Sequence, residues 1–123
     1  MLLFPWLPLP LARMALAIAT IAITALALMP APEVPVTTAW DKLDHGFAFF
    51  TLALLAEHAF PHQPFWRRIA LCVVAYGVGI EIVQWFTPDR DASVMDVLAD
   101  SIGVAGYGVV RVAAALVRPA PTG

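Results

Sequence analysis

Charged residues are scarce in this sequence, and their scarcity excludes an ordinary soluble domain. Only 13% of the 123 residues are charged, whereas 61% are hydrophobic. A soluble domain of this length needs a mostly polar surface, which this composition does not supply. Seven Lys and Arg residues against nine Asp and Glu residues leave a net charge of −2, so we expect no binding to nucleic acid.

Cysteine is almost lacking as well. The single cysteine, Cys72, lies inside an apolar run and has no partner for an internal disulfide. The sequence also lacks the Cys/His spacing of a zinc site, and we predict neither a metal ion nor another cofactor. Cysteine usage therefore says nothing about the compartment.

Long apolar runs are abundant, and each is ended by a proline. A spanning helix needs about 20 mostly apolar residues. Four runs meet this need, at residues 11–29, 43–60, 69–86 and 94–117, and they are followed by Pro30, Pro61, Pro88 and Pro119. The sequence predicts an all-α, membrane-embedded four-helix bundle. Residues 1–39 would hold the first span, uncleaved, and a proline-rich loop, 40–118 a three-helix core and 119–123 a short tail.

The Lys and Arg residues predict the orientation of these spans. Five fall on one side of the predicted membrane, namely Arg13, Arg67, Arg68, Arg111 and Arg118, and two on the other, Lys42 and Arg90. Because cytoplasmic loops are enriched in Lys and Arg, we expect both termini in the cytoplasm.

Polar residues that are costly to bury in a bilayer lie inside or at the ends of three of the predicted spans. Asp41 and His45 stand four residues apart, as do Asp96 and Asp100, so each pair shares a helical face. By the rise of a helix, Glu81 lies roughly 7 Å and Asp100 roughly 9 Å inside its span. Charged residues at such depth are expensive and indicate a function.

Alternating helix direction brings these positions to the outward end of the bundle. We expect them to form one pocket that binds a ligand, with the residues Asp41, Lys42, His45, Glu81, Gln84, Arg90, Ser93, Asp96 and Asp100. The simpler interpretation is that residues near helix ends reach the headgroups, and that Asp96 is an anion favoured in the first turn of a helix. Glu81 and Asp100 are too deep and too short for that explanation.

Two further expectations concern the other polar residues and the glycines. Glu57, His58 and His62, at the cytoplasmic end of the second span, are expected to face water. The glycines near Glu81 and Asp100 are expected to let the third and fourth spans pack closely, which would bring those two carboxylates together.

The order of these motifs resembles a known family. Asp41-Lys42-x-x-His45 opens one predicted helix and Glu81-x-x-Gln84 closes the next, and they are followed by Arg90, Ser93, the run Asp96-Val97-Leu98-Ala99-Asp100, Gly103 and Gly106. Over residues 40–110 the chain resembles the VanZ-like family of small bacterial membrane proteins, named for an accessory teicoplanin-resistance protein. Members usually carry Asn where this chain has Asp100. The resemblance implies a location in the bacterial inner membrane and a role in the cell envelope, but no particular reaction.

Several functions remain open from the sequence. The pocket could bind the headgroup of a lipid or of a peptidoglycan precursor, with Lys42 and Arg90 at phosphate or carboxylate groups. A membrane-surface enzyme could use His45 oriented by Asp41, with Ser93 or Ser101 as nucleophile, or a divalent cation held by His45, Glu81, Asp96 and Asp100. A proton-coupled transport component ranks lower, because the polar residues do not cross the midplane. A scaffold role and homo-oligomers also stay open.

Overall fold

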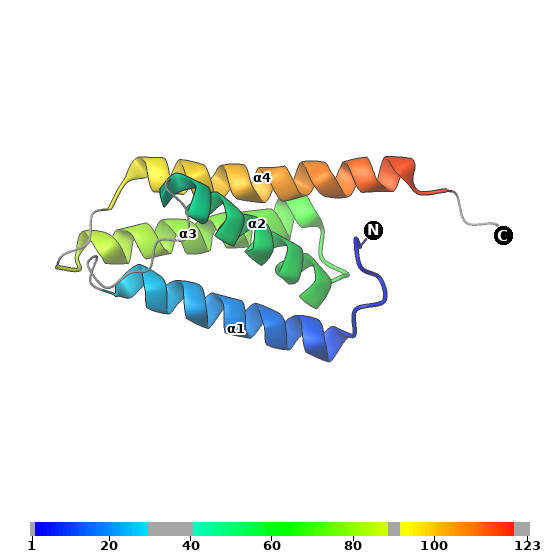
Figure 1. Ribbon diagram of the computed structural model, residues 1–123, viewed down its shortest axis with the longest axis horizontal. Coiled ribbons are helices and arrows are strands. Elements are labelled where there is room, and N and C mark those ends of the chain that lie inside the picture. The colour runs from blue at the N-terminus through cyan, green and yellow to red at the C-terminus, as the bar shows by residue number, and fades with distance from the viewer. Residues whose placement is uncertain (1, 30–40, 89–91, 120–123) are drawn as a thin grey trace.

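The computed structural model describes residues 2–29, 41–88 and 92–119, except for the side chain of Asp41. They form four α-helices, α1 (Leu9–Leu28), α2 (Asp41–Ala59), α3 (Ala70–Trp85) and α4 (Val94–Val117), and the described residues contain no strand. The predicted all-α, four-helix architecture is confirmed. Successive helices run in opposite directions, so α1 begins and α4 ends at the same end of the bundle (Figure 1).

The boundary before α3 differs from the prediction. The helical path begins at Phe65, four residues before the predicted start at 69, with a π-helical turn Phe65–Ile69 directly after Pro64. The wider turn lets both Phe65 and Ile69 face the core, where they are 4% and 5% exposed. Phe65–Trp85 therefore forms one continuous helical segment of 21 residues.

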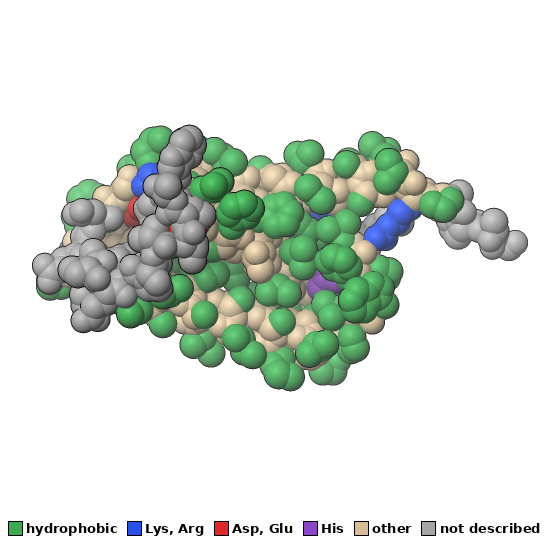
Figure 2. Space-filling view, in the orientation of Figure 1, with side chains coloured by type: hydrophobic (Ala, Val, Ile, Leu, Met, Phe, Trp, Pro, Cys, Tyr) green, Lys and Arg blue, Asp and Glu red, His purple; other side chains and the backbone are tan. Residues whose placement is uncertain are grey.

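Three helical segments are long and apolar enough to cross a membrane, namely Leu9–Leu28, Phe65–Trp85 and Val94–Val117. The face seen in Figure 2 is accordingly mostly apolar. α2 is not among the three, because Lys42, Asp44 and Glu57 lower its hydropathy. Its contacts with α4 and with α1 are the most extensive between helices of the described chain, and its Glu57 and His58 are buried against protein. The chain is a multi-pass membrane protein.

α2 and α4 run parallel and keep one register along their length. Lys42 contacts Asp96 near one end and Glu57 contacts Arg111 near the other, and both pairs are 54 residues apart in sequence. Between them lies the apolar core, where Phe49, Leu52, Ala53, Val104 and Tyr107 are all at most 3% exposed. This register decides which polar residues of the two helices can meet.

Candidate functional site

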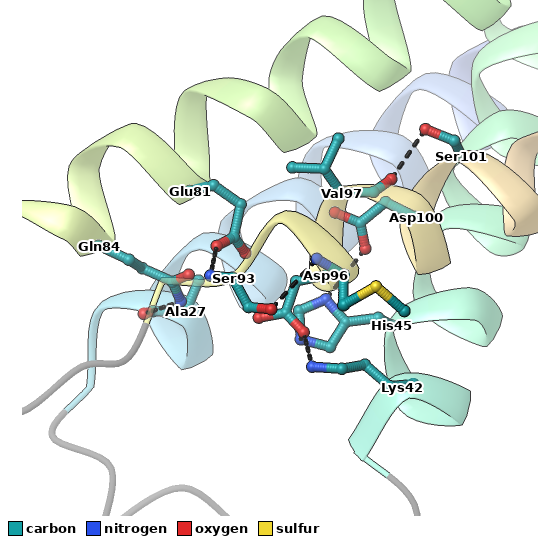
Figure 3. A network of polar contacts seen from close by, with 11 residues as sticks. Ala27, Lys42, His45, Glu81, Gln84, Ser93, Asp96, Val97, Asp100 and Ser101 are labelled. Carbon is teal, nitrogen blue, oxygen red and sulfur yellow. Dashed lines mark hydrogen bonds and ion pairs between the residues drawn. The ribbon is translucent and has the colours of Figure 1, made fainter.

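The polar residues gather at the end of the bundle where α2 and α4 begin and α3 ends (Figure 3). Seven of the nine predicted site residues lie within the described side chains, namely Lys42, His45, Glu81, Gln84, Ser93, Asp96 and Asp100. Arg90 and the side chain of Asp41 lie outside them. Sequence reasoning therefore located the cluster, and its internal pairing comes from the structure.

His45 and Asp100 form the centre of this polar cluster. His45 Nδ1 lies 3.0 Å from Asp100 Oδ1, and the Asp100 residue is only 2% exposed. The sequence predicted that Asp41 orients His45, and that contact lies outside the described side chains; within them, the deeper carboxylate of α4 lies against the ring. The imidazole is thus held by a neighbouring helix, with 23% of its side chain still exposed.

Glycines make room for this contact. A β-carbon on Gly77 of α3 would lie 2.9 Å from Asp100 Oδ2, and one on Gly103 of α4 would lie 2.2 Å from the carbonyl oxygen of Gly46. The sequence predicted that these glycines join the third and fourth spans. Gly77 fits this prediction, because it faces Asp100 of α4. Gly103 instead joins α4 to α2 at Gly46, the residue after His45, and a β-carbon on Gly79 would meet nothing within 4 Å. Close backbone approach is what small residues permit between membrane helices.

Lys42 and Asp96 form an ion pair at the exposed side of the cluster. Lys42 Nζ donates to Asp96 Oδ1. The side chain of Lys42 is 48% exposed and that of Asp96 only 7%, so the ion pair leads from the surface into the bundle. Asp96 Oδ1 also lies 3.9 Å from His45 Nε2. Asp96 is therefore more than an anion in the first turn of a helix, because it contacts both Lys42 and His45 of α2.

Glu81 joins α3 to the start of α4 through a hydrogen bond. Its Oε2 accepts a hydrogen bond of 2.9 Å from the backbone N–H of Ser93, while the Ser93 hydroxyl oxygen accepts one of 3.1 Å from the N–H of Met95. Ser93 is the N-cap of α4, so its backbone and side chain position the first turn. Glu81 is thereby held next to the helix that carries Asp96 and Asp100.

Two buried oxygens of α3 have no donor within the described part of the chain. They are Glu81 Oε1 and Gln84 Oε1. The amide nitrogen of Gln84 donates to the carbonyl oxygen of Ala27 at 2.8 Å, which orients the amide. Glu81 is 7% and Gln84 2% exposed. An unpaired buried acceptor costs about 1–3 kcal/mol, so this side of the cluster favours a hydrogen-bond donor.

The geometry narrows the chemistry that the cluster can perform. Among the described residues, no three His, Cys, Asp or Glu side chains stand where they could hold one metal ion, so the four-ligand set considered from the sequence is not assembled. The hydroxyl of Ser101 donates to the carbonyl oxygen of Val97 at 2.8 Å, and the Ser93 hydroxyl caps α4. Both candidate nucleophiles are thus engaged in local hydrogen bonds.

A second group of polar residues, around Glu57 and His58, lies at the opposite end of the bundle, where the sequence-based prediction was wrong. Glu57 and His58 were expected to face water, yet each is only 3% exposed. Glu57 accepts hydrogen bonds from Tyr107 and, at 2.8 Å, from Arg111 Nε. His58 Nε2 accepts from the N–H of Phe4, while Nδ1 donates to the carbonyl oxygen of Leu54. The burial of Glu57 follows from the parallel register of α2 and α4, which places Glu57 level with Arg111. His62 is exposed, as predicted.

The comparison with protein families covers almost the whole bundle. Residues 6–114 match the VanZ/LLP1 family. The chain belongs to the VanZ/LLP1 family. This match includes α1 and so extends the resemblance, which rested on residues 40–110. Comparison with curated proteins and with solved structures gives no match. Membership of the VanZ/LLP1 family assigns no ligand or reaction, so the function of this VanZ/LLP1 chain has to be inferred from its polar cluster.

Proposed function

We propose that this VanZ-like protein acts in the bacterial cell envelope by binding a headgroup that carries a primary ammonium next to a phosphate. Such a headgroup belongs to an amine-bearing phospholipid. The other class considered from the sequence, a peptidoglycan-related headgroup, carries its amino groups on the peptide and fits less well. The observation that carries the proposal is the pair of unpaired buried acceptors, Glu81 Oε1 and Gln84 Oε1. A primary ammonium offers three donors, so it can serve both oxygens at once.

The charge of the cluster also favours a cationic group. Its described side chains include three buried carboxylates, Glu81, Asp96 and Asp100. Lys42 is paired with Asp96, and His45 adds a positive charge only when protonated. Carboxylates held together in a low-dielectric interior are stabilised by a further positive charge. We assign the phosphate to Lys42, because about half of its side chain is exposed at the edge of the cluster.

The distribution of Lys and Arg supports an outward-facing site in the inner membrane. Arg13 contacts the end of α2, Arg111 contacts Glu57, and Arg118 contacts the backbone of Leu2, so these cations share the end opposite the polar cluster. Cytoplasmic segments carry the excess of Lys and Arg, which would place the cluster outside. A protein that holds envelope headgroups there would affect tolerance to glycopeptides such as teicoplanin.

Proton transport is less well supported than binding. The two polar groups of the bundle are separated by buried apolar side chains of α2 and α4, including Phe49, Ala53 and Val104. Along α4 the gap from Asp100 to Tyr107 is seven residues, which corresponds to roughly 10 Å. A proton relay needs a continuous chain of polar groups, so the described residues favour two separate polar sites.

The direct test compares two lipids that differ only in their N–H groups. The purified full chain is mixed with phosphatidylethanolamine or phosphatidylcholine of the same acyl composition, and retained lipid is measured by native mass spectrometry. We expect retention of the ethanolamine lipid, and weaker retention in Glu81→Gln, because the neutral amide removes the negative charge that attracts the ammonium. Glu57→Gln is the matched control, since it neutralises a buried carboxylate at the other end.

Equal retention of both lipids by the unmodified chain would overturn the proposal, whether or not the variants fold. The cellular arm uses a teicoplanin-sensitive bacterium that expresses the unmodified chain or Glu81→Gln. We expect a higher minimum inhibitory concentration only with the unmodified chain. No change with either chain would remove glycopeptide tolerance from the proposal and leave the binding test to decide the rest.

A further inference from the structure

An apolar cleft opens between α1, α2 and α3, away from the polar cluster. It has a volume of about 420 Å³, and its walls include Leu16 of α1, Ala56 of α2 and Cys72 of α3. An adjoining hollow of about 590 Å³ runs along α1 and shares Leu16, Thr20 and Phe60 with the cleft. Volumes of 300–1,000 Å³ are typical of sites for small molecules.

The cleft is closed at one end by hydrogen bonds between α1 and α3. The hydroxyl of Tyr76 contacts that of Thr24 and lies 3.3 Å from the carbonyl oxygen of Thr20. The open end is marked by Arg68, eight residues before Tyr76, which corresponds to roughly 12 Å along a helix. One leaflet of a bilayer has a hydrocarbon depth of roughly 15 Å, half of the whole core. The cleft thus extends over about one leaflet.

Two arginines stand where the apolar walls meet the membrane surface. Arg68 lines the cleft and Arg13 lines the adjoining hollow. Within the described part of the chain, no carboxylate pairs with Arg68. Arg13 uses Nε for the carbonyl oxygen of Ala59 at 3.2 Å, and its guanidinium lies over the ring of Phe60. Its Nη groups have no acceptor within the described residues, and a guanidinium group suits a phosphate.

We infer that this cleft binds an anionic phospholipid of the leaflet at this end, with acyl chain in the apolar cleft and phosphate at Arg68 and Arg13. The cleft and the adjoining hollow match the two acyl chains of such a lipid. The hydrogen bonds of Tyr76 close the cleft at the depth where a chain ends. The solvent around these helices is lipid, so an apolar cleft open to it is filled by acyl chains. The arginines select among lipids by charge. This site is independent of the headgroup site at the other end.

The only cysteine of the chain reports directly on the cleft. Cys72 lines it and is exposed, so a lipid bound there should shield its thiol from alkylation. The purified full chain in detergent is treated with N-ethylmaleimide, with dioleoylphosphatidylglycerol or dioleoylphosphatidylcholine present, and alkylation is followed by mass spectrometry. We expect the anionic lipid to slow alkylation by about tenfold at a concentration roughly ten times its dissociation constant.

Arg68→Gln should lose most of this protection, whereas Arg67→Gln should keep it. The two variants remove the same charge from neighbouring exposed positions, and only Arg68 lines the cleft. Equal protection by both lipids, or equal loss in both variants, would overturn the inference. Protection that depends on protein concentration without lipid would also overturn it, because a second copy of the chain would then be the occupant.

Discussion

Gly103 of α4 packs directly against the backbone of Gly46 in α2. A β-carbon added to Gly103 would lie 2.2 Å from the carbonyl oxygen of Gly46 and 3.1 Å from its α-carbon. These glycines adjoin the contact between His45 and Asp100, whose atoms lie 3.0 Å apart. Close approach of the two backbones thus brings a short aspartate and a histidine into hydrogen-bond distance.

Gly103→Ala should destabilise the bundle by about 1–3 kcal/mol, because overpacking a close contact forces the helices apart. The obstacle is backbone, which has no rotamer to change. Thermal unfolding of the purified chain in detergent measures the effect. Gly79→Ala is the matched control, since a β-carbon there would meet nothing within 4 Å. Because Ala has the higher helix propensity, Gly79→Ala should leave the stability unchanged or raise it slightly. Equal loss of stability in both variants would contradict a role for this contact.

Arg111→Met should destabilise the chain by about 3–5 kcal/mol, because it leaves Glu57 as a buried charge without its cation. The side chains of Arg111 and Glu57 are 19% and 4% exposed, and their closest atoms lie 2.8 Å apart. The double variant Glu57→Leu with Arg111→Met should recover most of this loss. Unfolding of the single and double variants in one cycle measures the coupling. Simple additivity of the two changes would contradict the buried pair.

Tyr76→Phe should weaken the attachment of α1 to α3 by about 1 kcal/mol, the usual net value of a hydrogen bond. The hydroxyl bridges Thr24 and the carbonyl oxygen of Thr20. Thr51→Val is a suitable control, because the exposed Thr51 hydroxyl bonds only within its own helix, to the carbonyl oxygen of Phe47. We expect lower thermal stability only for Tyr76→Phe. If both variants behave alike, the bridge contributes no stability.

The sequence was sufficient to predict the helices and the end at which polar residues meet. Apolar runs ended by prolines predicted the helices, and alternating direction brought Lys42, Glu81 and Asp96 to one end. These inferences need only helix length and order. The described structure confirms that the predicted site residues within it gather there.

The pairing within the cluster could not be predicted in the same way. The sequence shows that Asp41 lies four residues from His45, but it does not show that Asp100 of α4 also reaches the ring, which depends on how close α2 and α4 come. That distance is decided by Gly46 and Gly103 together, and sequence alone does not show which glycines face each other. The burial of Glu57 was missed for the same reason, because its partner Arg111 lies 54 residues away.

The most direct test of the central claim uses headgroups without acyl chains, which do not engage the apolar cleft. Glycerophosphoethanolamine and glycerophosphocholine are each titrated into the purified full chain, and the unfolding temperature is measured. Binding to the folded state at ten times the dissociation constant adds about 1.4 kcal/mol of stability, which raises the midpoint by several degrees. We predict this rise for glycerophosphoethanolamine alone, and its loss in Glu81→Gln. An equal rise with both compounds, or none with either, would contradict a site built for an ammonium group.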